Sequence, residues 1–347
     1  MKAFQPDFRH LQEAAWNRQP QRLPLYEHQI NLSRIEAVLN RPLQEIWDDG
    51  GMHEFYRHYC DFFLKMGYDT VSFEECLCNV LPGGGALGGH KKGVIRDRAD
   101  FERYPWDEIP QLYITRNQPR FEAMRKALPP GMRIVGGVGN GIFECVQDLT
   151  GYMDLCYISA DDPELYRDLF ARVASVITQI WGWFLSEFAD ICAVCRIGDD
   201  LGFKSNTLIS TADIHAHILP AYKKIVDLVH GCQKPFLLHS CGNLLEVMDD
   251  IIRVTGINAK HSNEDQIAPF HVWVERFGDR IGNFGGIDTG ELCRLSKPEM
   301  REYILTLIRR CECHGGFAFS SGNSIPDYVP IEGYLNMIEI VREYRGA

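Results

Sequence analysis

The stretch Phe236–Asn243 holds an imidazole and a thiol at a spacing that suits metal binding. The apolar run Phe236-Leu-Leu238 ends in His239-Ser-Cys241, and a helical pattern follows. Residues two apart in an extended strand point to the same face, so His239 and Cys241 should point together from the end of a buried strand. Imidazole nitrogen and thiolate sulfur are both zinc ligands. The pair therefore predicts half of a zinc site.

A third ligand is expected just past the next strand. The run Ile257–His261 is followed closely by Glu264, and a carboxylate completes three protein ligands while leaving a position open for water or substrate. A metal held there could act as a Lewis acid, or lower the pKa of a bound thiol or water. In the alternative interpretation, His239 and Cys241 only pack at a strand end and Glu264 is solvated.

Eight short apolar segments could supply the strands that position these residues. They lie near residues 24–28, 70–74, 133–139, 191–197, 235–240, 257–261, 281–287 and 316–321. Helical patterns separate most of them, which indicates a parallel sheet covered on both faces. Eight such units predict a closed (β/α)8 barrel, the TIM barrel. A doubly wound open sheet is the alternative.

Residues 1–347 are expected to form a single barrel domain, since the chain length fits one large barrel with insertions. It would carry an N-terminal helical extension and a glycine-rich insertion near residues 79–104. A long loop inside a compact domain is usually functional or disordered. The insertion is therefore expected to be a mobile lid or an interface arm, with phosphate binding as the alternative.

Polar residues recur at the carboxyl ends of the expected strands, where barrel enzymes build their sites. These mouth residues are Glu27, His28, Glu74, Asn140, Asp199, Asp200, His239, Cys241, His261, Glu264, Asp288, Ser320, Ser321 and Asn323. For Asp199 and Asp200, helix capping and local hydrogen bonding are an alternative role.

Composition limits the partners and the location. The net charge of −11 argues against nucleic acid or an anionic membrane as the main partner. The segment Met1–Pro20 lacks the apolar core of a signal peptide, and no apolar run approaches the roughly 18 residues of a membrane span. We therefore expect a cytoplasmic protein.

The 12 cysteines indicate reduced thiols rather than a disulfide framework. Cys192 and Cys195 invite a redox interpretation, but positions three apart on a strand face opposite sides. A redox role for this pair is therefore not expected.

Several motifs resemble the uroporphyrinogen decarboxylase superfamily, in its corrinoid-dependent methyltransferase branch. The segment His239-Ser-Cys-Gly-Asn243 is similar to the signature of that branch. Further similar segments are Gly198–Gly202, Leu219–Lys224, Gly285–Asp288 and Gly322–Pro326, within a similarity that covers most of residues 20–345. The resemblance implies a (β/α)8 barrel, and methyl transfer to or from the cobalt of a separate corrinoid protein.

Two departures from the family pattern shape the prediction. True uroporphyrinogen decarboxylases carry an Arg-Gln-Ala-Gly-Arg-Tyr segment for substrate carboxylates, whereas this chain reads Leu25-Tyr-Glu-His-Gln-Ile30. Thiol-methylating members add a cysteine at the last strand, where this chain reads Phe319-Ser-Ser-Gly322. The related cobalamin-independent methionine synthases use a Glu one strand after the His-x-Cys pair, and Glu264 matches that spacing. A site with one thiolate suits polarising an ether or amine better than activating a thiol.

The leading hypothesis is a zinc-dependent methyltransferase. It would demethylate a small methoxylated or methylated substrate and pass the methyl group to cobalamin held by a partner corrinoid protein. A uroporphyrinogen decarboxylase-like decarboxylase and a non-catalytic tetrapyrrole- or corrinoid-binding protein are the alternatives. The oligomeric state is left open, with a homodimer as one option.

Each site residue has an expected role under this hypothesis. The metal ligands are His239, Cys241 and Glu264. Asp199 is expected to orient substrate or assist proton transfer, because a leaving alkoxide or amine must gain a proton, and His261 is the second candidate acid. The residues expected to bind cofactor are Asn140, Asp200 and Asn323.

Overall fold

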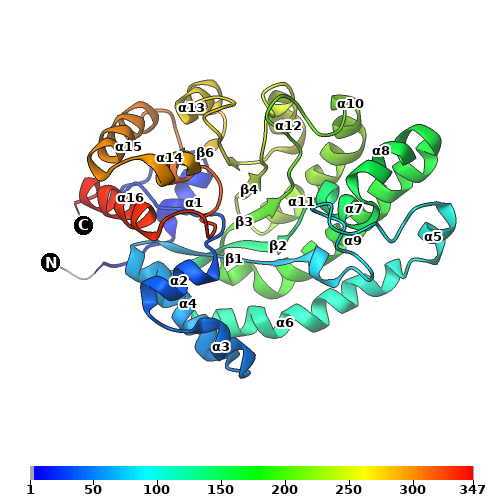
Figure 1. Ribbon diagram of the computed structural model, residues 1–347, viewed down its shortest axis with the longest axis horizontal. Helices are drawn as coiled ribbons and strands as arrows, with labels where there is room; N and C mark the ends of the chain where they lie inside the picture. The colour runs from blue at the N-terminus through cyan, green and yellow to red at the C-terminus, as the bar shows by residue number, and fades with distance from the viewer. Residues whose placement is uncertain (1–3, 347) are drawn as a thin grey trace.

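Parallel strands form the centre of the molecule, and helices surround them (Figure 1). The computed structural model describes residues 4–346. Within that range, seven strands pair side by side in chain order, all parallel. They are β1 (Thr70–Cys76), β2 (Arg133–Gly139), β3 (Cys192–Gly198), β4 (Phe236–His239), β5 (Ala259–His261), β6 (Gly282–Ile287) and β7 (Phe317–Ser321). A doubly wound sheet would reverse its order part-way, so the strand order confirms a TIM-barrel-like α/β fold.

Helices follow the strands and cover the outside of the sheet. The α-helices are α1 (Arg9–Ala15), α2 (Leu32–Leu39), α3 (Leu43–Asp48), α4 (Met52–Met66), α5 (Arg98–Arg103), α6 (Ile109–Ala127), α7 (Ile142–Thr150), α8 (Tyr152–Asp161), α9 (Pro163–Phe188), α10 (Thr211–Asp213), α11 (Leu219–Gly231), α12 (Met248–Thr255), α13 (Phe270–Phe277), α14 (Thr289–Arg294), α15 (Lys297–Cys311) and α16 (Ile331–Tyr344). Shorter helical turns are η1 (Leu77–Val80), η2 (Trp106–Glu108), η3 (Ala189–Ile191) and η4 (Ile214–Ile218).

The prediction of a first strand near residues 24–28 needs correction. This segment is not a full strand, because its ladder consists of a single parallel bridge between Leu25 and Phe319 of β7. Two backbone hydrogen bonds flank that bridge, from Phe319 N to the Pro24 carbonyl at 3.0 Å and from Tyr26 N to the Phe319 carbonyl at 2.9 Å. Toward β1 the contact is a side chain, since the Ser72 hydroxyl donates to the Glu27 carbonyl. The segment therefore occupies the eighth position without forming a regular ladder.

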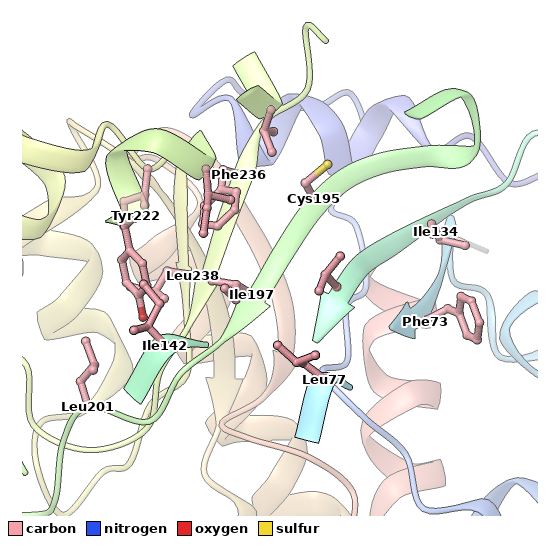
Figure 2. Close-up of a cluster of buried hydrophobic side chains, with 14 of the residues drawn as sticks. Phe73, Leu77, Ile134, Ile142, Cys195, Ile197, Leu201, Tyr222, Phe236 and Leu238 are labelled. Atoms are coloured by element: carbon pink, nitrogen blue, oxygen red, sulfur yellow. The ribbon is translucent and has the colours of Figure 1, made fainter. Parts of the chain in front are cut away.

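Two apolar cores lie on opposite sides of the strands. The larger lies between the sheet and the helices, and Figure 2 shows part of it, with Phe236 and Leu238 of β4 near Tyr222 of α11. The smaller is inside the barrel, where alternate strand residues such as Val194, Leu237 and Ala259 meet. Because side chains alternate along a strand, the next inward positions lie closer to the carboxyl ends, and there the interior becomes polar.

Helix α1 packs against the amino ends of the strands. Its Ala14 backbone approaches Gly282 and Gly316 so closely that an added Cβ on either glycine would lie within 2.2 Å of the Ala14 carbonyl oxygen. The Gln12 amide donates to the Ala193 carbonyl at 3.0 Å. This end of the barrel is therefore filled by protein, which leaves the carboxyl end for a site.

One segment is long and apolar enough to cross a membrane by length and composition, namely Pro163–Ile191, which contains α9. Half of its most apolar window is buried inside the protein. Buried side chains such as Ile177, Trp181 and Phe184 belong to the outer core. Buried core helices can have the same length and composition. Packing of α9 against the sheet therefore accounts for its apolar sequence.

The two cysteines expected on opposite faces of a strand lie together. The Sγ atoms of Cys192 and Cys195 are 3.8 Å apart and fully buried. The expectation was wrong because the β2–β3 register shifts at this point: Cys192 pairs with Ile134 and Val194 with Val135. The extra residue interrupts the alternation on which the prediction depended.

The glycine-rich segment docks on the carboxyl end of α7. Asp148 accepts hydrogen bonds from Gly85 N at 2.9 Å and Leu87 N at 3.2 Å. Gly93 lies so close to Thr150 that an added Cβ would be 2.2 Å from its backbone. These contacts hold the segment beside α7, and a lid or interface role for it stays a prediction.

Candidate metal centre at the barrel mouth

The inward positions nearest the carboxyl ends of β4 and β5 are both histidines. His239 pairs with His261 across these strands, and Gly198 of β3 pairs with His239 on the other side. Both imidazoles are buried. Alternation places their rings inside the barrel, so neighbouring strands bring together two residues that are distant in sequence.

Three donor atoms of different kinds converge at the end of β4. The Nε2 atom of His239 lies 3.6 Å from the Sγ of Cys241 and 3.9 Å from an oxygen of Asp200. The three donor atoms all lie within 4.8 Å of one another. The Cys241 backbone N–H donates to Asp200 Oδ1 at 2.8 Å, which holds the loop after β3 against the loop after β4. Nitrogen, sulfur and carboxylate oxygen are the ligand types of zinc, and three of them leave one position open.

Asn323, which was expected to bind cofactor, contacts this cluster directly. Its amide Nδ2 lies 3.3 Å from the Sγ of Cys241. It reaches the cluster from the loop after β7. An N–H donor beside sulfur favours the thiolate over the thiol, so Asn323 supports a ligand at Cys241.

A second group of potential ligands lies beside the first. The donor atoms of His28, His239 and His261 also lie within 4.8 Å of one another. The His28 ring stacks on the His239 ring, with centroids 3.5 Å apart and planes 5° apart. Within the described chain, the buried Nδ1 of His28 has no hydrogen-bond partner. His28 was expected at the mouth, but its stacking on the candidate ligand could not be foreseen from spacing.

Burial favours the neutral forms of the imidazoles and the thiol of the site. It lowers the pKa of His239 well below its usual range, and nearby His261 and Arg196 lower it further. Burial likewise lowers the pKa of His261, to about 3. The thiol pKa of Cys241 is raised by burial and by the charge of Asp200. A divalent cation would offset the cost of the thiolate and carboxylate charges together, so the donor set fits a metal ion.

Asp199 is held by three donors around its carboxylate. Glu144 N donates to Oδ1 at 2.9 Å, Phe143 N donates to Oδ2 at 3.1 Å, and the Tyr222 hydroxyl donates to Oδ2 at 2.5 Å. These amides belong to the first turn of α7, where a carboxylate is favoured. Burial raises the pKa of Asp199 to about 6 against these hydrogen bonds. Proton transfer from Asp199 to a substrate would require one of the three bonds to break.

Asn140 and Glu144 form the wall next to Asp200. Asn140 adopts a left-handed conformation with φ 63°, and its Nδ2 donates to Glu144 Oε2 at 2.8 Å. Its Oδ1 accepts from Cys78 N at 3.2 Å, and Glu144 Oε1 accepts from Asp200 N at 3.3 Å. Burial raises the pKa of Glu144 well above its usual range, and Asp199 and Asp200 raise it further. Sequence reasoning left Glu144 out of the site, although its spacing of four residues from Asn140 on a helical pattern was a usable signal.

Glu264 does not join either ligand group of the described residues. Its carbonyl accepts from Ile267 N at 3.0 Å, so the chain begins a helical turn there. The preceding Asn263 is anchored to β6, since Gly286 N donates to Asn263 Oδ1 at 3.1 Å. Asp200, expected to bind cofactor, lies where a third ligand was sought, and ligation by Glu264 stays a prediction.

Two other mouth residues have structural roles in their own loops. Asp288 accepts from Gly290 N at 2.7 Å at the start of α14, and from Asp265 N at 2.9 Å. Ser320 donates from its hydroxyl to the Ser321 carbonyl at 2.7 Å. These contacts shape the rim of the barrel on the side of β6 and β7.

A buried arginine of β3 lies among the strands. Arg196 is fully buried and pairs with Glu74, with Nη2 2.9 Å from Oε2. Its Nη1 donates to the Tyr26 hydroxyl at 2.9 Å and to the His28 carbonyl at 3.1 Å. The guanidinium therefore ties the segment near residues 24–28 to β1 and β3. Alternation along β3 was the available signal for this residue, and sequence reasoning did not use it.

We expect Glu27→Gln to flatten the pH dependence of stability. Glu27 is buried, and burial raises its pKa to about 8, against about 4.3 in the unfolded chain. Between these values the folded state holds a proton that the unfolded state lacks, so the free energy of unfolding falls as pH rises through this window. The full effect is at most about 5 kcal/mol.

Urea unfolding at a series of pH values measures this dependence. Glutamine can still accept from Ser321 N and donate to the Ser321 hydroxyl, which now contact the two Glu27 oxygens at 2.9 and 2.6 Å. The exposed Glu332→Gln is the matched control and should behave as the wild type. Equal pH dependence in wild type and Glu27→Gln would contradict the burial argument.

The protein is therefore a TIM-barrel-like α/β protein with a candidate metal site of His, Cys and carboxylate donors at the carboxyl end of its strands. The sequence also places it in a family. The sequence profile of the family described as uroporphyrinogen decarboxylase (URO-D) matches residues 90–344. The chain belongs to this family, as its motifs predicted. No curated protein matches the sequence.

One solved structure shares the fold, and a second has a lower TM-score. A methyltransferase from Methanosarcina mazei is 15% identical, with a TM-score of 0.71, and the match covers 98% of this chain and 99% of that chain. A structural-genomics target from Listeria monocytogenes, described as a candidate vitamin-B12-independent methionine synthase, is 11% identical, with a TM-score of 0.49 and coverage of 94% and 100%. At 15% identity the first likeness establishes the fold.

Proposed function

We propose that this protein is a methyltransferase that moves a methyl group from a small methoxylated or methylated substrate to the cobalt of a corrinoid protein. The observation that carries the proposal is the convergence of His239, Cys241 and Asp200 within 4.8 Å at the barrel mouth. The fold of a methyltransferase from Methanosarcina mazei supports the reaction class. We expect a cytoplasmic location and cobalamin supplied by the partner.

The residues of the mouth would hold zinc through His239 Nε2, Cys241 Sγ and an oxygen of Asp200. When bound, the metal would supply Lewis-acid polarisation of the substrate heteroatom that carries the methyl group. With a single thiolate, the donor set suits an ether oxygen or amine nitrogen better than a thiol. The side-chain amide of Asn323, whose nitrogen lies 3.3 Å from the Cys241 sulfur, would donate a hydrogen bond to that thiolate.

Proton delivery to the leaving group is a task for the carboxyls of this site. A leaving alkoxide or amine must gain a proton. Glu144 is a partly exposed carboxyl, and burial together with nearby Asp199 and Asp200 raises its pKa well above the usual range, which favours its protonated form. Asp199 is fully buried, so we assign it the orienting part of its predicted role. It fixes the first turn of α7, which carries Glu144.

Decarboxylation of a porphyrinogen is less well supported, because it requires cationic groups for several substrate carboxylates. The arginine-rich segment is replaced near residues 25–30. Arg196 is fully buried and already paired with Glu74 at 2.9 Å. The mouth is instead bordered by carboxylates, which disfavours a polyanionic substrate.

The test is methyl transfer with free cob(I)alamin as the acceptor. Zinc-loaded protein is incubated with panels of methoxylated aromatics and methylated amines, and methylcob(III)alamin and demethylated product are measured. We expect one substrate class to give both products. We also expect Asp200→Asn to reduce the rate by more than about 100-fold, because losing a ligand should cost more than the 10–100-fold lost when a group that hydrogen-bonds to a ligand is removed. The exposed Asp227→Asn is the matched control. Release of carbon dioxide from a carboxylated tetrapyrrole without methyl transfer would contradict the proposal.

A further inference from the structure

We propose that His261 is a positioning residue that fixes the tautomer of His239. In that tautomer the lone pair of His239 Nε2 faces Cys241 and Asp200, ready for a metal. The inference rests on the metal site of the proposed function, and it concerns a residue that the sequence had suggested as an acid. Both ring nitrogens of His261 are engaged within the protein.

The hydrogen-bond chain has one direction. His261 Nε2 lies 3.1 Å from the carbonyl oxygen of Ser321, and a carbonyl only accepts, so this nitrogen carries the hydrogen. A neutral imidazole has one N–H, so His261 Nδ1 is an acceptor. It lies 2.8 Å from His239 Nδ1, which must therefore donate. The remaining nitrogen of His239, Nε2, is left with its lone pair.

The surroundings keep His261 neutral. Its side chain is fully buried, and its two ring nitrogens contact an imidazole and a backbone carbonyl, neither of which carries the negative charge that would stabilise a cation. The carboxylate of Glu74 is already paired with Arg196 at 2.9 Å. A cationic His261 would donate from Nδ1 and force the hydrogen of His239 onto Nε2, which would block ligation.

The acceptor at the start of the chain is held rigidly. Ser321 N donates to Glu27 Oε1 at 2.9 Å, and the Ser321 hydroxyl donates to Oε2 at 2.6 Å. The Tyr26 ring meets the His261 ring edge-on, with centroids 5.0 Å apart and planes at 81°. The stacked His28 ring covers His239. Neither imidazole can turn without losing a buried contact, so the tautomer is set before any metal binds.

Nitrogen-15 NMR of the zinc-free, histidine-labelled protein tests the tautomer directly. We expect His239, assigned from the signal lost in His239→Gln, to be protonated at Nδ1 and unprotonated at Nε2. A wild-type protein with the hydrogen of His239 on Nε2 overturns the inference. This readout does not depend on methyl transfer or on bound zinc, so it separates failure of the inference from failure of the proposed function.

Zinc affinity, measured by competition with a chelator, tests the consequence. Loss of the acceptor in His261→Leu should weaken binding by about 10–100-fold, the range for partners of metal-bound histidines, whereas His261→Asn keeps an acceptor near Nδ1 and should bind more tightly than His261→Leu. The exposed His53→Leu is the control. Zinc bound equally tightly by His261→Leu and wild type overturns the inference. If His261→Leu does not fold, the wild-type NMR result decides.

Discussion

Replacing Cys241 with serine should abolish stoichiometric zinc binding and reduce methyl transfer by more than about 100-fold. The change removes the single sulfur from a cluster whose other donors are a nitrogen of His239 and an oxygen of Asp200. Mutating a group that hydrogen-bonds to a metal ligand costs about 10–100-fold in metal affinity or activity, so loss of the ligand itself should cost more. Zinc per protein after dialysis, and the initial rate with cob(I)alamin, measure the two effects.

A matched cysteine separates ligand loss from a general effect of removing a thiol. Cys293 is exposed, and Cys293→Ser should keep wild-type zinc content and rate. Cys241→Ser should also keep the fold, because the side chain lies at the rim of the barrel and is only partly buried. Full zinc content in Cys241→Ser would exclude Cys241 as a ligand.

Replacing Arg196 with methionine should destabilise the fold by about 3–5 kcal/mol, the cost of leaving one member of a buried ion pair unpaired. Glu74 would remain in the interior with its partner gone, since its contact with Arg196 is 2.9 Å long and both side chains are almost fully buried. The hydrogen bonds from Arg196 to Tyr26 and to the His28 carbonyl would also be lost. Chemical unfolding measures the loss.

The double variant Arg196→Met/Glu74→Gln separates the cost of the unpaired Glu74 charge from the cost of the lost Arg196 hydrogen bonds. Removing the stranded carboxylate should recover part of the stability, because most of the cost lies in the unpaired charge. The surface pair of Arg301 and Glu343 provides the control, and Arg301→Met should change stability by less than about 1 kcal/mol. A double variant no more stable than the single one would contradict the electrostatic account.

The sequence predicted the barrel and the proximity of the His239 and Cys241 side chains, because both depend on local patterns. Alternation of side chains along β4 suffices to place His239 and Cys241 on one face. The regular alternation of strands and helices suffices for the parallel sheet. The capping box of Ser296 and Glu299 at the start of α15 is also local, because it forms within four consecutive residues.

Other features depend on contacts between distant segments. Local alternation failed at Cys192 and Cys195 because the register with β2 shifts there. The loop after β5 is directed by the bond between Asn263 and Gly286, so spacing alone could not locate Glu264. The same holds for Asp200, whose place beside Cys241 depends on a hydrogen bond between two loops.

X-ray absorption at the zinc edge of the wild-type protein identifies the atoms bound to the proposed zinc ion. We expect about one zinc per chain, with one sulfur neighbour near 2.3 Å and the remaining neighbours nitrogen or oxygen near 2.0–2.2 Å. The sulfur would be that of Cys241, and no second thiolate is expected in the shell. Absence of zinc after loading, or a shell with two or more sulfur neighbours or with none, would contradict a site formed by His239, Cys241 and Asp200.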